Sequence, residues 1–247
     1  MSNRDKRHIS FNDAIWSKYP NSLDLTKPLS ILAVAQARHF IKLSMHHTFY
    51  LLDVSQLNCV ENAIIFDGQQ GILKTTQTTR ELIREYWVQA DLWHRPSLKY
   101  WAQKLGITQH KIPFIKGDVC LIPLGANTQK STSWFSTASL TDHIKRTGKQ
   151  TELVYDQRLR LIIPVSTKVI KRQLTDNQQM QVVLNQTMAR QLQFITGELP
   201  PSESSPSLWQ CDRTLAYNLI HFAFQSRDLV FTSQDVQQTL NTYLGKF

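Results

Sequence analysis

A chain of 247 residues with 41% hydrophobic side chains can bury one sizeable core, and its apolar runs fall short of the roughly 18 to 20 residues that cross a bilayer. The N-terminus has no apolar segment of a secretory signal, so these observations exclude membrane-spanning and secreted proteins and predict a globular cytoplasmic one. The formal net charge of +9 lies in the central part of the chain, because residues 95 to 190 carry 15 Lys and Arg against 5 Asp and Glu. Such a segment is expected to face a polyanion, the alternative being a solvated basic surface without that partner.

Residues 1 to 45 are predicted to be an N-terminal arm and a helix. The first 25 residues show little periodicity, which indicates a loose arm. The run KPLSILAVAQARHFIKL at 27 to 43 is apolar at helical spacing, with Pro28 near the first helical position and Thr26 as the N-cap.

Residues 46 to 195 are predicted to be an α+β domain with a small, mostly antiparallel sheet and flanking helices. Two β-like runs come first, at 47 to 54 and 61 to 75. The second run turns at Asp67-Gly68, since this pair tolerates the positive φ angles of a tight turn.

Two helices are predicted next. The sequence TTRE at 78 to 81 is a capping box ahead of apolar residues at helical spacing. The second helix opens at Arg95-Pro96 and ends at Gly106.

Short strands are predicted over residues 111 to 136, followed by an antiparallel pair joined at Asp156-Gln157. A long amphipathic helix begins at Ser166.

The C-terminal part is predicted to be a Pro- and Ser-containing linker at 196 to 207 and a helical appendage at 208 to 247. The appendage is expected to hold two helices, at 208 to 224 and 233 to 244, the second capped at Thr232 or Ser233.

The stretch AQKLGITQHKIPFIKG, residues 102 to 117, begins like a helix-turn-helix but does not continue as one. Pro113 lacks a backbone donor and disfavours helix at Ile112, so a recognition helix after Gly106 would be too short to cross a major groove. We interpret the stretch as a helix C-cap that leads into an edge strand whose basic side chains face phosphate.

Basic and short polar residues of the central segment are the candidate nucleic-acid contacts, because each cation can neutralise a phosphate and release a counterion. The loop GANTQKSTS adds amide and hydroxyl groups suited to a narrow groove. The candidates are Arg95, Lys99, Lys104, His110, Lys111, Lys116, Asn127, Gln129, Lys130, Ser131, Lys145, Arg146 and Lys149.

Catalytic and metal-binding patterns are not found in the sequence. The histidines lack the spacing of metal ligands, and the acids of the basic segment form no DxD or ExxE pair, which weakens two-metal nuclease chemistry. The three cysteines, Cys59, Cys120 and Cys211, lack CxxC spacing and are interpreted as reduced core residues. We therefore expect no catalytic residues, no metal and no cofactor.

Several short motifs resemble, in order, those of the competence transcription factor family, ComK. They are TRELIREYW at 79 to 87, LGITQHKIPFI at 105 to 115, KGDVCLIP at 116 to 123 and TSWF at 132 to 135. His110, Lys111 and Pro113 match the family's HKxP element, Pro123 matches its FPT strand end, and Ser133 with Trp134 match its CSWI strand. The resemblance covers roughly residues 48 to 192.

The resemblance implies an oligomeric DNA-binding activator of DNA-uptake genes that contacts paired A/T-rich boxes mainly through the minor groove. A-tracts narrow that groove and concentrate negative potential, which attracts Lys and Arg on loops without a helix in the major groove. RNA polymerase and a regulatory proteolysis adaptor are the implied protein partners. The chain departs from the family at DLWHRPSLK, residues 91 to 99, where the family has a GSSYEGR stretch, and at GANTQK, where the family has a serine-proline pair.

Two other functions remain open from the sequence. One is a basic nucleic-acid-processing enzyme or accessory subunit, with His94 or His110 as the acid-base group. The other is an interaction protein whose basic face binds an acidic partner. Trp101 and Trp134 have the apolar spacing of core residues, although exposed tryptophans could stack on bases.

Overall fold

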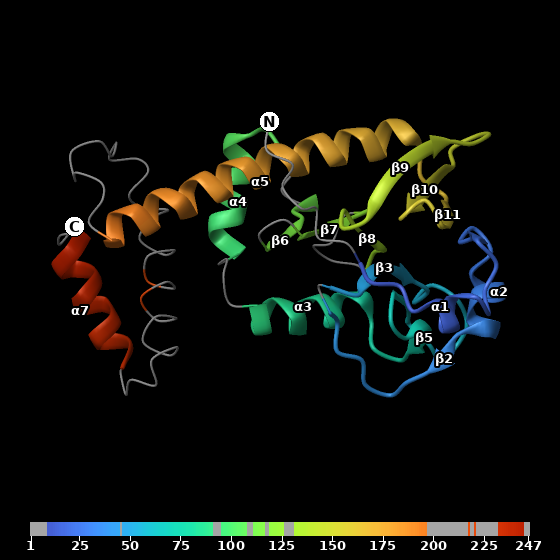
Figure 1. Ribbon diagram of the computed structural model, residues 1–247. Coiled ribbons are helices and arrows are strands. Elements are labelled where there is room, and N and C mark those ends of the chain that lie inside the picture. The colour runs from blue at the N-terminus through green and yellow to red at the C-terminus, as the bar shows by residue number, and fades with distance from the viewer. Residues whose placement is uncertain are drawn as a thin grey trace. The chain divides into compact units, whose positions relative to one another are not determined.

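The chain divides into two compact units, residues 1–89 with 110–178 and residues 90–109 with 179–247. The first unit contains both β-sheets, so the α+β class is confirmed (Figure 1). The domain boundaries expected from the sequence stay predictions. The computed structural model describes residues 9–44, 46–90, 95–107, 111–116, 119–125, 131–196, 217, 220 and 232–244.

The described strands form two sheets where the sequence predicted one small sheet. A four-stranded sheet has the order β1 (Ser22–Asp24), β11 (Leu159–Ile163), β10 (Thr151–Tyr155) and β9 (Leu140–Lys145). A seven-stranded sheet has the order β2 (Gln36–Ala37), β5 (Gly71–Thr75), β4 (Ala63–Asp67), β3 (Thr48–Asp53), β8 (Trp134–Ser136), β7 (Val119–Pro123) and β6 (Phe114–Lys116). Neighbouring strands are antiparallel except in the parallel pairs β1–β11 and β2–β5.

The expectation of a single small sheet is wrong because three strands carry little sequence signal. β1 and β2 have three and two residues, too few to show alternation. β9 lies at a sheet edge and is largely exposed, so its sequence LTDHIK has no apolar face.

One hydrophobic cluster draws its side chains from both sheets. The ring of Phe49 in β3 lies 5.0 Å from that of Tyr155 in β10 and 6.1 Å from that of Phe66 in β4. The Tyr155 hydroxyl is directed at the carbonyls of Phe49 and Ser136, at 3.3 and 3.1 Å, and so joins the two sheets. Burial raises the pKa of this hydroxyl well above its ordinary value.

Tyr155→Phe is expected to lower the free energy of unfolding by about 1 to 2 kcal/mol, because it removes the donor to two buried carbonyls while keeping the ring. Urea denaturation at neutral pH measures the change. Tyr19→Phe is the matched control in the same unit, because the half-buried Tyr19 hydroxyl forms no hydrogen bond among the described residues, and a loss of equal size there would show that the inter-sheet bond carries no particular weight.

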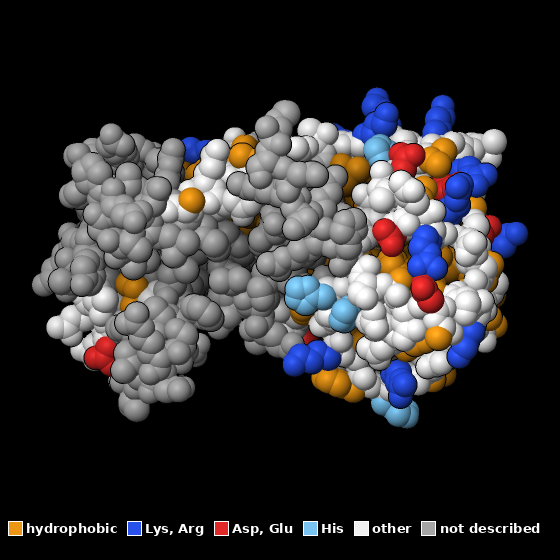
Figure 2. Space-filling model, in the orientation of Figure 1, with side chains coloured by type: hydrophobic (Ala, Val, Ile, Leu, Met, Phe, Trp, Pro, Cys, Tyr) orange, Lys and Arg blue, Asp and Glu red, His pale blue; other side chains and the backbone are white. Residues whose placement is uncertain are grey.

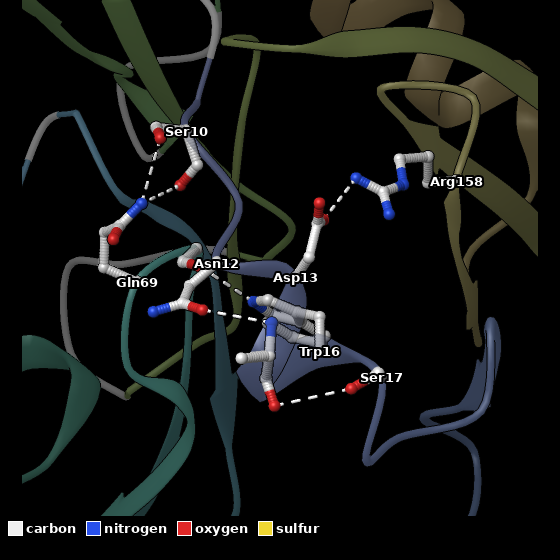
Figure 3. Close-up of polar contacts among 9 residues, drawn as sticks. Ser10, Asn12, Asp13, Trp16, Ser17, Gln69 and Arg158 are labelled. Atoms are coloured by element: carbon white, nitrogen blue, oxygen red, sulfur yellow. Dashed lines mark hydrogen bonds and ion pairs between the residues drawn. The ribbon is translucent and has the colours of Figure 1, made fainter.

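Residues 9 to 25 pack against the core, so for this part of the chain the loose arm is a wrong prediction, while residues 1 to 8 lie outside the described residues. Ile9 and Trp16 belong to the hydrophobic cluster, and α1 (Asp13–Trp16) lies beside the β4–β5 turn (Figure 3). Trp16 Nε1 donates to the Gly68 carbonyl at 2.9 Å, and Gln69 Nε2 donates to the Ser10 carbonyl at 2.7 Å. A Cβ added at Gly68 would come within 2.6 Å of the Ser10 oxygen, so only glycine permits this approach.

The helix expected over 27 to 43 is shorter than predicted. α2 (Pro28–Val34) ends where Ala35 turns extended, and the chain then pairs with β5 as β2. The edge of β5 offers backbone hydrogen bonds that the apolar spacing did not reveal. Pro28 is at the helix start as predicted, but the N-cap is Lys27, while Thr26 bonds to Asp24.

The predicted start of one helix and the predicted end of the next are confirmed. At α3 (Thr79–Ala90), Thr78 N–H donates to the Glu81 carboxylate at 2.7 Å, and this bond lowers the pKa of Glu81. At the end of α4 (Arg95–Lys104), Gly106 has a φ of 67° and Ile107 N–H donates to the Ala102 carbonyl at 2.7 Å. This pattern is the Schellman cap that the glycine predicts.

Both predicted turns are present, with one change. Asp156 and Gln157 have φ angles of 50° and 56°, as a two-residue hairpin turn requires. In the β4–β5 turn the left-handed residue is Gly71, with φ of 84°, rather than the Asp67-Gly68 pair. The Asp67 side chain instead accepts hydrogen bonds from the backbone N–H groups of Gln69 and Gln70, at 2.9 and 3.0 Å.

The C-terminal predictions are only partly within the described residues. α5 (Thr167–Thr196) follows Ser166 as predicted, and α7 (Ser233–Leu244) is capped by Thr232 together with Asp235. The expected linker beyond Thr196 and the expected helix at 208 to 224, apart from two helical residues, lie outside them. Cys120 is buried and Cys59 half-buried, both as free thiols, and Cys211 is not among the described residues.

Candidate nucleic-acid interface

The residues that carried the family resemblance come together at one end of the seven-stranded sheet. Pro123, the last residue of β7, lies opposite Trp134 of β8. Leu124 N–H donates to the Ser133 carbonyl at 2.8 Å, and the Lys111 ammonium donates to the Leu124 carbonyl at 3.4 Å. β6 forms the edge of the sheet, as the sequence predicted for the strand after Pro113.

The loop GANTQKSTS leaves this end of the sheet from fixed points. Gly125 N–H donates to Thr132 Oγ1 at 2.8 Å, and the Thr132 carbonyl accepts from Thr79 Oγ1 at 2.8 Å. Ser131 is half-buried at the base of the loop. Asn127, Gln129 and Lys130, together with His110, lie outside the described residues.

Lys111→Ala is expected to weaken DNA binding a few-fold and to lower the stability by about 1 kcal/mol, since its long hydrogen bond to Leu124 is lost along with the charge. Filter binding and thermal melting measure the two effects. Lys99→Ala removes an exposed cation of the other unit with no such bond among the described residues, so its melting temperature should match that of the parent.

A second basic group lies where the β9–β10 hairpin meets the start of α5. Thr151 Oγ1 donates to the Val165 carbonyl at 2.7 Å and lies 3.0 Å from Thr167 Oγ1, so the hairpin and the helix N-terminus are held together. Lys145 lies opposite Thr151 in the sheet. We name this group the hairpin–helix cluster; its members are Lys145, Arg146, Lys149, Lys168, Lys171 and Arg172.

Four lysines of the hairpin–helix cluster carry its free charge. Arg146 and Arg160 both bind the buried carboxylate of Glu152, the second at 2.8 Å, and Arg172 lies 3.7 Å from Asp176. Lys145, Lys149, Lys168 and Lys171 are exposed and form no ion pair within the described part of the chain. These four ammonium groups are available to an anionic partner.

The structure changes the setting of two predicted residues. Lys145 is the last residue of β9, whereas the sequence placed it in a loop or turn region. Arg146 is in the hairpin but its guanidinium is bound to Glu152, which the sequence could not show because the two residues meet across strands. Lys149 lies in the turn as predicted.

Lys168, Lys171 and Arg172 were not among the residues predicted from the sequence. They lie on exposed positions of the first turns of α5, and the run TKVIKR at 167 to 172 carried the signal. The helix also reaches the family-motif end of the sheet, where the buried Gln173 donates to the Pro123 carbonyl at 2.7 Å. Thr167 and Gln173 are about 9 Å apart along a helix, so α5 connects the two basic groups of this unit.

The candidate residues belong to both compact units. Lys99 and Lys104 of α4 are exposed in the other compact unit, where the Lys104 ammonium lies 5.6 Å from the centre of the Tyr100 ring. Arg95 opens the same helix, and Lys116 ends β6. On the visible face, most Lys and Arg side chains lie over the unit that contains the sheets (Figure 2).

Neither of the two acid-base candidates, His94 and His110, is among the described residues. Among those that are described, no three His, Cys, Asp or Glu side chains come close enough to hold a metal ion. No described helix has both the length and the apolar character to span a membrane.

Residues 103–189 match the family model described as ComK protein. This part of the chain is ComK-like. The matched segment begins in α4 and includes the β6–β7–β8 end of the sheet, the β9–β10 hairpin and most of α5. ComK is a family of competence transcription factors, and the similarity extends over about a third of the chain. No curated protein and no solved structure matches the chain.

Proposed function

We propose that the ComK-like chain is a sequence-selective DNA-binding activator of competence genes that recognises A/T-rich boxes largely through the minor groove. The observation that carries the proposal is the hairpin–helix cluster, in which four exposed lysines without ion pairs among the described residues lie within the matched segment. A narrow minor groove concentrates negative potential and attracts such side chains when they are held on hairpins or loops.

The proposed binding mode uses α5 as a rigid support. Thr167 at the start of this helix contacts Thr151 of the hairpin at 3.0 Å. Further along the helix, Gln173 donates to the carbonyl of Pro123, which ends the strand ahead of the GANTQKSTS loop. Two contacts held at fixed spacing can follow one duplex, with phosphate contacts setting the position and groove contacts setting the preference for A·T pairs. The cationic residues outside the described segments, Lys130 above all, belong to the same proposal.

An electrophoretic shift assay tests the DNA-binding proposal. The full chain is titrated into a duplex with paired A/T boxes, with a G/C-rich duplex of equal length as competitor, at two salt concentrations. We expect preference for the A/T duplex and a steep loss of affinity with salt. Equal affinity for the two duplexes would remove sequence-selective regulation, and no shift at low salt would remove DNA binding.

Oligomerisation and protein partners are part of the same proposal. Activators on paired boxes commonly bind as symmetric oligomers whose spacing matches that of the boxes. Light scattering of the full chain with and without a two-box duplex measures the stoichiometry. A single chain bound to both boxes would contradict the proposed oligomer. Direct contacts with RNA polymerase or a proteolysis adaptor are tested by pull-down after nuclease treatment, because a protein contact survives the loss of nucleic acid.

A further inference from the structure

An exposed edge of the seven-stranded sheet presents an aromatic ring among cations, outside the ComK-like segment. The edge comprises residues 36–42, QARHFIK, and begins with β2. Its backbone is held in place, since Arg38 N–H donates to the Lys74 carbonyl at 2.9 Å and Ile41 N–H donates to the Gln77 side chain at 3.0 Å.

Residues 36 to 40 of this edge are exposed, and from Phe40 to Leu43 exposed and buried residues alternate. Ile41 and Leu43 are buried, and they anchor the segment. Phe40 and Lys42 point outward, and the Phe40 side chain is 68% exposed, which is more than an anchored core residue would show. Ile41 between them is buried, so Phe40 and Lys42 both lie on the exposed side of the segment.

The charge around Phe40 is positive. No Asp or Glu occurs between Asp24 and Asp53, while Arg38 and Lys42, each two residues from Phe40 in the sequence, are exposed. Two carboxylates bind the residues that hold this segment in place. Glu61 lies 3.3 Å from the Lys74 ammonium, and Glu85 accepts a hydrogen bond from the Gln77 side chain at 3.3 Å. A lone exposed aromatic residue is common and needs no explanation. An exposed aromatic residue on a segment with cations and no acids is complementary to a partner that carries both negative charge and flat rings.

We propose that this edge binds single-stranded nucleic acid, with the Phe40 ring stacked on a base and the Arg38 and Lys42 side chains on the flanking phosphates. Sites for single strands combine cations along the backbone with aromatic rings that stack on bases. A single strand fits better than a duplex, because duplex bases are already stacked and must be parted before a ring can enter. The inference does not depend on the proposed duplex contacts.

Fluorescence anisotropy of labelled oligonucleotides tests the site. Homopolymers of dT and rU, each of about 12 nucleotides, are titrated with the full chain, and the two arms separate DNA from RNA. We expect Phe40→Ala to bind about fivefold to a hundredfold more weakly, which is the usual loss for one stacked base, and Phe40→Tyr to bind like the parent. The double variant Arg38→Gln/Lys42→Gln should flatten the dependence of log affinity on log salt by roughly 1 to 1.5.

Val60→Ala is the matched control, since Val60 is 77% exposed and lies next to Glu61 rather than among cations. It should leave binding unchanged. Equal binding of Phe40→Ala, Phe40→Tyr and the parent would overturn the stacking contact, and so would a parent that binds neither homopolymer. Duplex binding measured on the same proteins separates the proposals: a parent that binds the homopolymers but no duplex contradicts the regulator function alone, and a Phe40→Ala protein that loses duplex affinity but keeps single-strand affinity contradicts this site alone.

Discussion

Replacing Lys145, Lys149, Lys168 and Lys171 together by glutamine is expected to lower duplex affinity by about a hundredfold at moderate salt. Each lysine that neutralises a phosphate contributes about 0.9 to the slope of log affinity against log salt, so the slope should become shallower by roughly 3 to 4. The four side chains are exposed and unpaired among the described residues, so the free energy of unfolding should change little. Filter binding at several salt concentrations measures both quantities.

A pair of double variants shows whether position matters as well as charge. Lys145→Gln/Lys149→Gln removes two charges from the hairpin, and Lys18→Gln/Lys27→Gln removes two exposed charges from the N-terminal part of the same unit. If the hairpin–helix cluster is the contact surface, only the first double variant lowers the slope, by about 2. Equal losses in both would mean that duplex affinity follows net charge alone, and an unchanged slope in the quadruple variant would remove the cluster from the interface.

Elements whose signals lie in a few neighbouring residues were predicted from the sequence. The capping box of Thr78 and Glu81, the C-cap at Gly106 and the turn at Asp156-Gln157 each form within one helical turn or hairpin. Their energetics are local, so the same residues that carry the signal also make the hydrogen bonds.

Elements that depend on distant partners could not be predicted in this way. Leu23 in β1 pairs with Leu161 in β11, and the Ile9 backbone N–H donates to Ser139, far along the chain. The close approach of Ser10 to Gly68 needs a glycine that the sequence suggested only as a turn residue. The sequence pattern of residues 1 to 25 carries no information about contacts with residues so far along the chain. A packed segment was therefore predicted to be a loose arm.

In the candidate interface, too, local features were predicted and features that depend on distant contacts were not. Basic residues near the hairpin were recognised from local charge, but Arg146 is neutralised across the sheet by Glu152, and Lys168 and Lys171 join the hairpin through the Thr151–Thr167 contact. An amphipathic helix normally exposes a charged face, so lysines on α5 gave no reason to expect a site. Tertiary contacts therefore decided which cations are free and which lie together.

Trp134→Ala is expected to lower the free energy of unfolding by about 3 to 5 kcal/mol, the usual loss for a large aromatic residue in a core. Trp134 is only 3% exposed, and in β8 it lies between Leu51 of β3 and Pro123 of β7. β8 connects β7 and β6 to the rest of the seven-stranded sheet, so the cavity would open at the base of the family-motif end. The denaturant midpoint should fall while the m-value stays near that of the parent.

Trp134→Phe separates packing from base recognition, because phenylalanine keeps an aromatic face but fills less of the site. If Trp134 is a core residue, this variant should lose less than half as much stability as the alanine variant, and DNA affinity should fall only where the fold is destabilised. The stacking alternative predicts the reverse order: stability would stay near that of the parent in both variants, and Trp134→Ala alone would lose affinity. A Trp134→Ala protein as stable as the parent would thus contradict the buried position and return Trp134 to the set of nucleic-acid contacts.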